Sequence, residues 1–72
     1  MTLNGFCEAL QKEMPRFKII TSPMYTHQIS WSTSDRKIDG IVNIEDEVLL
    51  SNNIEIVKQI ITETYQGLLH IA

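Results

Sequence analysis

Residues 24–33, MYTHQISWST, carry the clearest secondary-structure pattern in the chain. From Tyr25 onward, larger side chains at odd positions alternate with Thr, Gln and Ser at even positions. A period of two is typical of a β-strand, because successive side chains point to opposite faces of the sheet. The pattern predicts a strand from Met24 to Thr33, with one face made of Tyr25, His27, Ile29, Trp31 and Thr33.

Segments on both sides of this strand complete a sheet. Residues 17–21, FKIIT, are rich in β-branched side chains, and Ser22-Pro23 follows them as a turn signal. After a polar connector of hairpin length at residues 34–37, residues 38–44 resume a β-rich pattern, interrupted by Gly40 as a site for a bulge. We therefore expect a three-stranded antiparallel sheet.

An amphipathic helix is expected before the sheet. From Leu3 to Met14, apolar residues recur at three- and four-residue steps with polar residues between them. Thr2 or Asn4 can cap the start of this helix, and Pro15 disfavours helical geometry at the residue before it. The first helix therefore ends near Met14.

A second helix is expected after the sheet. Asn52 followed by Glu55 resembles a capping arrangement, so the helix should start near Asn53 and carry a broad apolar stripe. Gly67 is a C-terminal cap in this interpretation, which leaves residues 68–72 as a final turn or an apolar tail. Residues 47–50 either extend the third strand or form a short extra one.

The expected fold class is α+β, a two-layer α-β-β-β-α domain in which a three-stranded antiparallel sheet packs against two helices. Its 72 residues allow one domain, residues 1–72, and 43% hydrophobic with 21% charged residues is a globular composition. Cys7 is the only cysteine, so no intrachain disulfide can form and a reducing compartment is expected. No secretion signal or membrane span is recognised, and we expect a cytoplasmic protein.

The sequence offers no pattern for catalysis or for a cofactor. Cys7 lies on the apolar stripe of the first helix, where a free cysteine behaves as a small hydrophobic residue. His27 and His70 are the only histidines and lack the companions of a zinc site, and the glycines form no phosphate-binding loop. We expect neither an enzyme nor a protein that binds a metal, a cofactor or another small molecule.

The charge disfavours direct binding to nucleic acid. Nine acidic and six basic residues give a formal net charge of −3, whereas proteins that grip phosphate backbones carry clustered positive charge. Domains that bind double-stranded RNA share the α-β-β-β-α order, but they need Lys and Arg at the start of the second helix. Residues 51–55 there read SNNIE.

Two groups of residues are expected to bind a macromolecular partner. Tyr25 and Trp31 share a strand face near its ends, and exposed Tyr and Trp are frequent interface anchors. A second interpretation places the same face beneath the helices. Acidic side chains at Asp39, Glu45, Asp46 and Glu47 form either a solvated edge or the rim of the interface, where they face a basic partner. They lack the spacing of a calcium loop.

Taken whole, from Met1 to Ala72, the chain resembles in length and sequence character the modulator of repression (MOR) family, small antirepressors of temperate lactococcal phages. The resemblance implies a protein that binds the N-terminal helix-turn-helix domain of its phage repressor. It also implies that the repressor is kept from its operators, which favours lytic growth in the host bacterial cell. No binding residue is carried over from the family.

Two other functions remain open from the residues. One is a small acidic phage inhibitor of a host nuclease that mimics DNA, as anti-CRISPR proteins do, although a net charge of −3 is low for that strategy. The other is an accessory subunit whose second helix, rich in Ile and Leu, completes the core of a larger complex.

Overall fold

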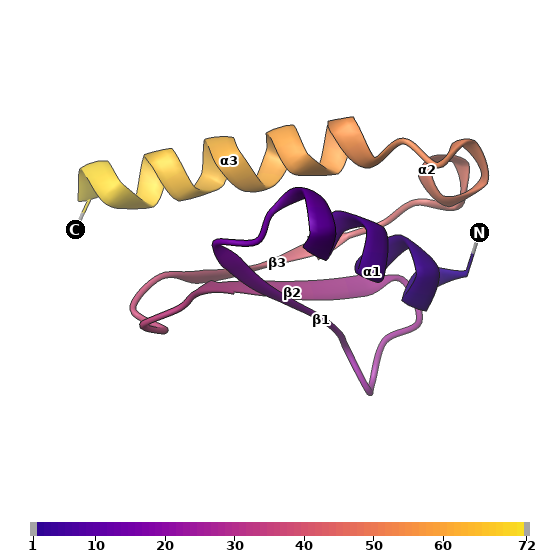
Figure 1. The fold of residues 1–72 in the computed structure, drawn as a ribbon, viewed down its shortest axis with the longest axis horizontal. Coiled ribbons are helices and arrows are strands. Elements are labelled where there is room, and N and C mark those ends of the chain that lie inside the picture. The colour runs from indigo at the N-terminus through magenta and orange to yellow at the C-terminus, as the bar shows by residue number, and fades with distance from the viewer. Residues whose placement is uncertain (1, 72) are drawn as a thin grey trace.

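A three-stranded antiparallel sheet and helices on one of its faces form two layers (Figure 1). The computed structural model describes residues 2–71. The strands, in sheet order, are β1 (Phe17–Thr21), β2 (Gln28–Thr33) and β3 (Asp39–Asn43), and the helices are α1 (Leu3–Glu13), α2 (Asp46–Ser51) and α3 (Ile54–Ile71). The expected α+β class and the antiparallel sheet are confirmed, with α2 as an additional element.

Local signals place α1 and β1 where the sequence predicts them. The Thr2 hydroxyl accepts a hydrogen bond from the Gly5 N–H at 3.1 Å, which satisfies one of the free donors at the start of α1. The helix ends before Pro15, and Phe6 and Leu10 on its apolar stripe are fully buried. β1 has the predicted bounds.

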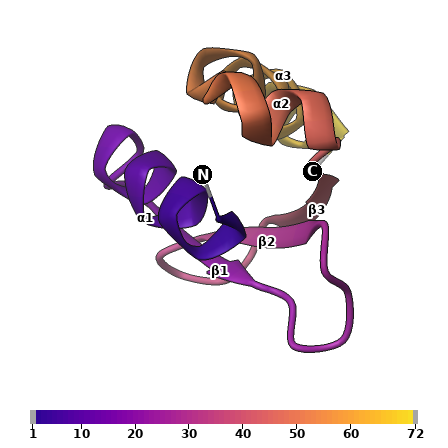
Figure 2. The same ribbon diagram turned by 90° about the vertical axis from the view of Figure 1, so that its right-hand side faces the viewer.

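The inner face of the sheet holds the core. Ile19 of β1 pairs with Trp31 of β2, and Ile29 of β2 pairs with Val42 of β3. These side chains lie on one face because residues two positions apart in a strand point the same way. The helices cover this face in Figure 2, and the core consists of Phe6, Cys7, Leu10, Met14, Ile19, Ile29, Trp31, Val42, Ile44, Val57 and Ile61.

The prediction of a strand beginning at Met24 is wrong, because β2 begins at Gln28. The Ser22 N–H donates to the Gln28 carbonyl at 3.1 Å, which closes the connection between β1 and β2 directly after β1 ends. Pro23 lacks an N–H to donate to a ladder. Residues 22–27 therefore form a loop, since alternation of side chains makes a strand only where a neighbouring strand supplies hydrogen bonds.

Gly40 forms no bulge. It pairs in register with Trp31, and a Cβ atom at position 40 would lie 2.6 Å from Cζ2 of the Trp31 ring. The glycine is therefore needed for the close approach of the indole to the backbone of β3.

Residues 46–51 form α2, so the prediction of a strand or strand extension at residues 47–50 is wrong. Asp46 and Glu47 occupy the first turn, where carboxylates interact favourably with the positive end of the helix dipole. Asn52 ends the helix in the left-handed conformation, with φ 53°. Asparagine is one of the few residues other than glycine that adopts this conformation readily.

α3 begins at Ile54, close to the predicted start, but its cap is Asn53 and not Asn52: the Asn53 side-chain oxygen accepts the Ile56 N–H at 3.3 Å. Gly67 does not end the helix, which continues to Ile71; Ala72 lies outside the described residues. Leu68 packs against the core, and this contact holds the last turns in place despite the low helix propensity of glycine.

Gly67→Ala is expected to stabilise the domain by about 0.5–1 kcal/mol. A Cβ atom at position 67 would meet no other atom within 4 Å, and alanine loses less backbone entropy on helix formation. Thermal and urea unfolding followed by circular dichroism measure the change. A loss of stability would show that the C-terminal turns of α3 are not helical in solution.

Candidate partner-binding surfaces

One end of the molecule gathers the acidic residues that begin α2. Glu45, Asp46 and Glu47 are all exposed. His27, at the end of the loop before β2, places its Nε2 atom 2.6 Å from Oδ1 of Asp46. This contact joins the loop to α2, so residues far apart in the sequence meet at one end of the sheet.

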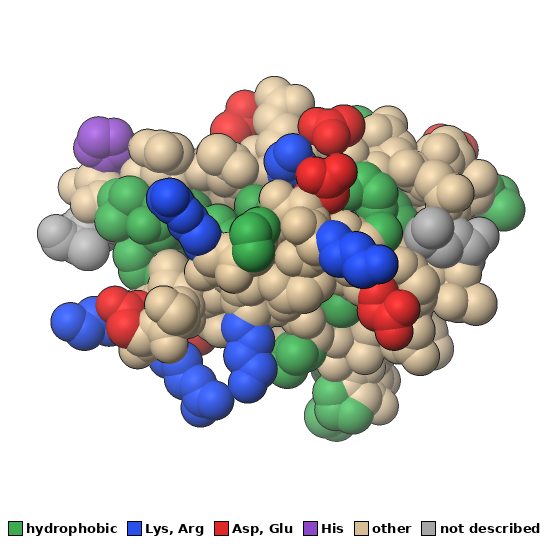
Figure 3. All heavy atoms as spheres, in the orientation of Figure 1, with side chains coloured by type: hydrophobic (Ala, Val, Ile, Leu, Met, Phe, Trp, Pro, Cys, Tyr) green, Lys and Arg blue, Asp and Glu red, His purple; other side chains and the backbone are tan. Residues whose placement is uncertain are grey.

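The same end exposes apolar side chains. Tyr25 is 60% exposed on the loop, Met24 beside it is more exposed still, and Leu50 projects from α2. Figure 3 shows the loop protruding at the lower right with hydrophobic side chains at its tip. We call this the loop–α2 surface, defined by Met24, Tyr25, Glu45, Asp46, Glu47 and Leu50. Exposed aromatic and apolar groups next to charge are typical of protein interfaces.

The prediction that Trp31 is an exposed anchor is wrong. Only 1% of its surface is exposed, and its ring packs edge-on against Phe17 with the centroids 5.7 Å apart. Tyr25 and Trp31 share no strand face either, because residues 22–27 are a loop. The second interpretation holds for Ile29 and Trp31, whose face of β2 lies beneath the helices.

Asp39 does not join the other acidic residues. It lies at the start of β3, whereas Glu45 follows the end of that strand, and six residues of extended chain span roughly 20 Å. Asp39 instead lines a surface depression with Lys18 and Arg36. The predicted acidic rim is therefore limited to Glu45, Asp46 and Glu47.

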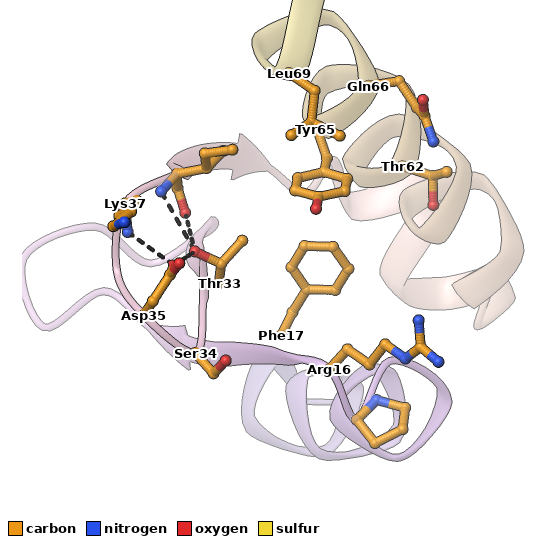
Figure 4. Close-up of a pocket in the computed structure, with 12 residues that line it drawn as sticks. Arg16, Phe17, Thr33, Ser34, Asp35, Lys37, Thr62, Tyr65, Gln66 and Leu69 are labelled. Atoms are coloured by element: carbon orange, nitrogen blue, oxygen red, sulfur yellow. Dashed lines mark hydrogen bonds between the residues drawn. The ribbon is translucent and has the colours of Figure 1, made fainter. Parts of the chain in front are cut away.

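An open groove of about 800 Å³ lies at the opposite end of the molecule, between α3 and the turn from β2 to β3 (Figure 4). Phe17 and Tyr65 meet edge to face in it, with the ring centroids 5.2 Å apart, and Leu69 points toward them. Asp35 accepts hydrogen bonds from Thr33 and the Lys37 N–H, which lower the pKa of its carboxyl group. No pattern in the sequence predicts this groove, because it forms between segments distant in the chain.

Basic side chains gather around the same end. Arg16, Lys18, Arg36 and Lys37, four of the six Lys and Arg residues, line this groove or the two depressions beside it. Lys and Arg side chains cluster at the lower left of Figure 3. Because the β2–β3 hairpin brings these residues together, the cluster is not visible in the sequence, and the molecule carries opposite charge at its two ends.

Cys7 is buried in the core, and its thiol lies 3.5 Å from the Ile19 carbonyl oxygen, to which it donates. Burial, with a smaller contribution from the charge of Glu8, raises the pKa of the thiol above its ordinary value. The reactive thiolate is therefore disfavoured. Among the described residues, no three His, Cys, Asp or Glu side chains are grouped as metal ligands would be.

Comparison of the chain with family models, with curated proteins and with solved structures finds no match. Within residues 2–71, no helix combines the length and the apolar character that a membrane span requires. The proposals below therefore rest on the surfaces of this chain.

Proposed function

We propose that this chain is an antirepressor that binds the helix-turn-helix domain of its phage repressor through the loop–α2 surface. In this proposal, binding keeps the repressor from its operators and favours the lytic cycle. The observation that supports it most is the contact between His27 and Asp46, which joins the loop that carries exposed Tyr25 to the acidic start of α2 at residues 45–47.

The chemistry of the proposed partner explains why the loop–α2 surface is assigned to the contact. A helix-turn-helix domain presents Lys and Arg to phosphate groups, so its DNA-binding face is basic. Carboxylates opposite that face accelerate encounter and fix orientation, while an aromatic side chain buried in the contact supplies affinity. The loop–α2 surface offers both kinds of group.

The proposal assigns no catalysis, no metal, no small-molecule ligand and no membrane contact to the chain, and it places the chain in the host cytoplasm. It also assigns no direct binding to DNA. Although basic residues cluster near the β2–β3 turn, Asp35 and Asp39 lie among them, and the formal net charge is −3. This cluster is smaller and more mixed in charge than a phosphate-binding surface requires.

An accessory subunit is less well supported. Val57 and Ile61, from the apolar stripe of α3, are buried in the chain's own core, which leaves Ile56, Ile60 and Leu69, each less than half exposed, for contact with another protein.

Tyr25→Ala is expected to accelerate dissociation from the repressor domain about 30-fold, the equivalent of about 2 kcal/mol.

Neutralising the rim with Glu45→Gln, Asp46→Asn and Glu47→Gln together should instead slow association several-fold and flatten its salt dependence, since exposed charges act over roughly 8 Å in physiological salt. Surface plasmon resonance at several salt concentrations measures both rates.

Matched controls lie elsewhere on the surface. Ile20→Ala shortens a half-exposed side chain on the outer face of the sheet, and Glu8→Gln with Glu63→Gln neutralises exposed acids of α1 and α3. These variants should keep the wild-type rates. If Tyr25→Ala and the triple variant also bind at wild-type rates, the repressor contact lies on another surface.

A further inference from the structure

The two edges of the sheet differ in whether their outward-facing backbone groups are already hydrogen-bonded. At the β1 edge, the Ile19 N–H donates to the Gln11 side-chain oxygen at 2.8 Å, and the Gln11 side-chain nitrogen donates to the Phe17 carbonyl at 2.7 Å. The Cys7 thiol reaches the Ile19 carbonyl from the same helix. α1 therefore occupies the polar backbone groups at which another strand would pair.

The β3 edge is open. The Thr33 N–H donates to the Ile38 carbonyl at 2.9 Å and the Ile44 N–H to the His27 carbonyl at 2.6 Å, which fixes the alternation of hydrogen bonds along β2 and β3. The N–H and C=O groups of Asp39, Ile41 and Asn43 therefore point away from β2. None of them has a hydrogen-bond partner within residues 2–71.

β3 forms the margin of the sheet opposite α1 (Figure 2). Ile41, at the middle of the strand, is 64% exposed. An edge strand with free backbone groups and an exposed apolar side chain is a template for pairing with a further strand.

We propose that β3 pairs antiparallel with β3 of a second copy of this chain, around a two-fold axis at Ile41, so that two sheets join into one. In this register each Ile41 lies opposite its counterpart, and Asp39 lies opposite Asn43 of the other copy. All five residues of the strand are paired, the three outward-facing residues exchange backbone hydrogen bonds, and no two like charges meet.

Shifted registers are worse. Centring the axis on Asp39 places two carboxylates directly opposite each other, and centring it on Asn43 places Asp39 opposite Glu47, which carries the same charge and belongs to α2. Like charges in directly opposed positions destabilise a strand pair. The sequence of β3 is thus complementary to itself in one register, which favours a second copy over an unrelated strand.

α3 supports the same arrangement. Its Lys58 side chain lies 3.7 Å from Glu13 of α1, so that flank of the helix faces α1. Ile56 and Ile60 lie on the other flank, each 43% exposed, and line a depression with Asn43 of β3. The two-fold rotation that pairs the two β3 strands places the Ile56 and Ile60 flanks of both copies on the same face of the combined sheet.

The closed β1 edge limits the assembly. Since only the β3 edge can pair, two copies use up both open edges, and the product is a closed dimer rather than a growing sheet.

Substitutions of Asn43 test this register. Asn43 is exposed, and the two-fold axis places two Asn43–Asp39 pairs in each dimer. Asn43→Asp should raise the Kd for dimerisation at least tenfold at low ionic strength, and Asn43→Lys should lower it, with both effects reduced by salt. Sedimentation equilibrium measures the Kd, and circular dichroism confirms the fold. Ile20→Asp and Ile20→Lys, on the β1 side of the same face, are the matched pair and should leave the Kd unchanged.

If the two Asn43 variants change the Kd in opposite directions and the two Ile20 variants leave it unchanged, the pairing of the β3 strands and its register are established. The proposal is overturned if the wild-type chain stays monomeric at millimolar concentration. It is equally overturned if both Asn43 variants change the Kd in the same direction or if the Ile20 pair reproduces their effect.

Discussion

Trp31→Ala is expected to remove a large share of the stability of the domain. The indole is the largest fully buried side chain and contacts Phe17 from the centre of the sheet. Truncating a buried Trp costs about 3–5 kcal/mol. A domain of this length has a total stability of roughly 4–11 kcal/mol, at about 0.05–0.15 kcal/mol per residue, so the substitution removes a large share of it.

Trp31→Phe is the matched control, because it keeps an aromatic ring and removes only part of the indole. Within the described residues, the Trp31 Nε1–H is buried without a hydrogen-bond acceptor, and an unpaired buried donor costs roughly 1–3 kcal/mol. Losing that group offsets part of the lost packing, so the Phe variant should be far more stable than the Ala variant. Near-wild-type urea unfolding of Trp31→Ala, followed by circular dichroism, would contradict the core described here.

Gly40→Ala is expected to destabilise the domain by about 1–3 kcal/mol, a typical cost of overpacking. The new Cβ would lie 2.6 Å from Cζ2 and 2.7 Å from Cε2 of Trp31. The ring is packed in the core, so neither the indole nor β3 can move without losing other contacts. Urea unfolding of the single variant measures the effect, which has the opposite sign to that of Gly67→Ala.

A double-mutant cycle separates this clash from the general effect of adding a side chain to β3. In the Trp31→Phe background the smaller ring leaves more room, so Gly40→Ala should cost less than in the wild type. Equal costs in the two backgrounds would mean that the contact between Gly40 and Trp31 does not limit packing.

Much of the fold is predictable because its signals are local. Thr2, Pro15 and the apolar stripe of α1 specify a helix by short-range geometry, and the residues of β1 specify a strand in the same way. The wrong predictions concern segments whose structure depends on contacts with residues distant in the chain. Residues 24–27 alternate as a strand would, but no neighbouring strand pairs with them. Gly67 stays helical because Leu68 packs on the core.

The candidate surface was predicted only in part. The sequence singled out Tyr25 and residues 45–47, and the structure places them at one end of the molecule. Alternation shows that Trp31 shares a face with Ile29, but whether that face is buried depends on where the helices pack. Arg16 and Lys37 are 21 positions apart in the chain, and only the sheet brings them to one groove.

Displacement of the repressor from its operator tests the antirepressor proposal most directly. Fluorescence anisotropy of a labelled operator bound by the repressor's helix-turn-helix domain is followed as this chain is added. We predict that the wild-type chain returns the anisotropy to that of free DNA, that Tyr25→Ala needs a much higher concentration, and that the chain without repressor leaves the signal unchanged. A repressor–operator complex that persists at saturating wild-type chain, or binding of the chain alone to the duplex at micromolar concentration, would contradict the account.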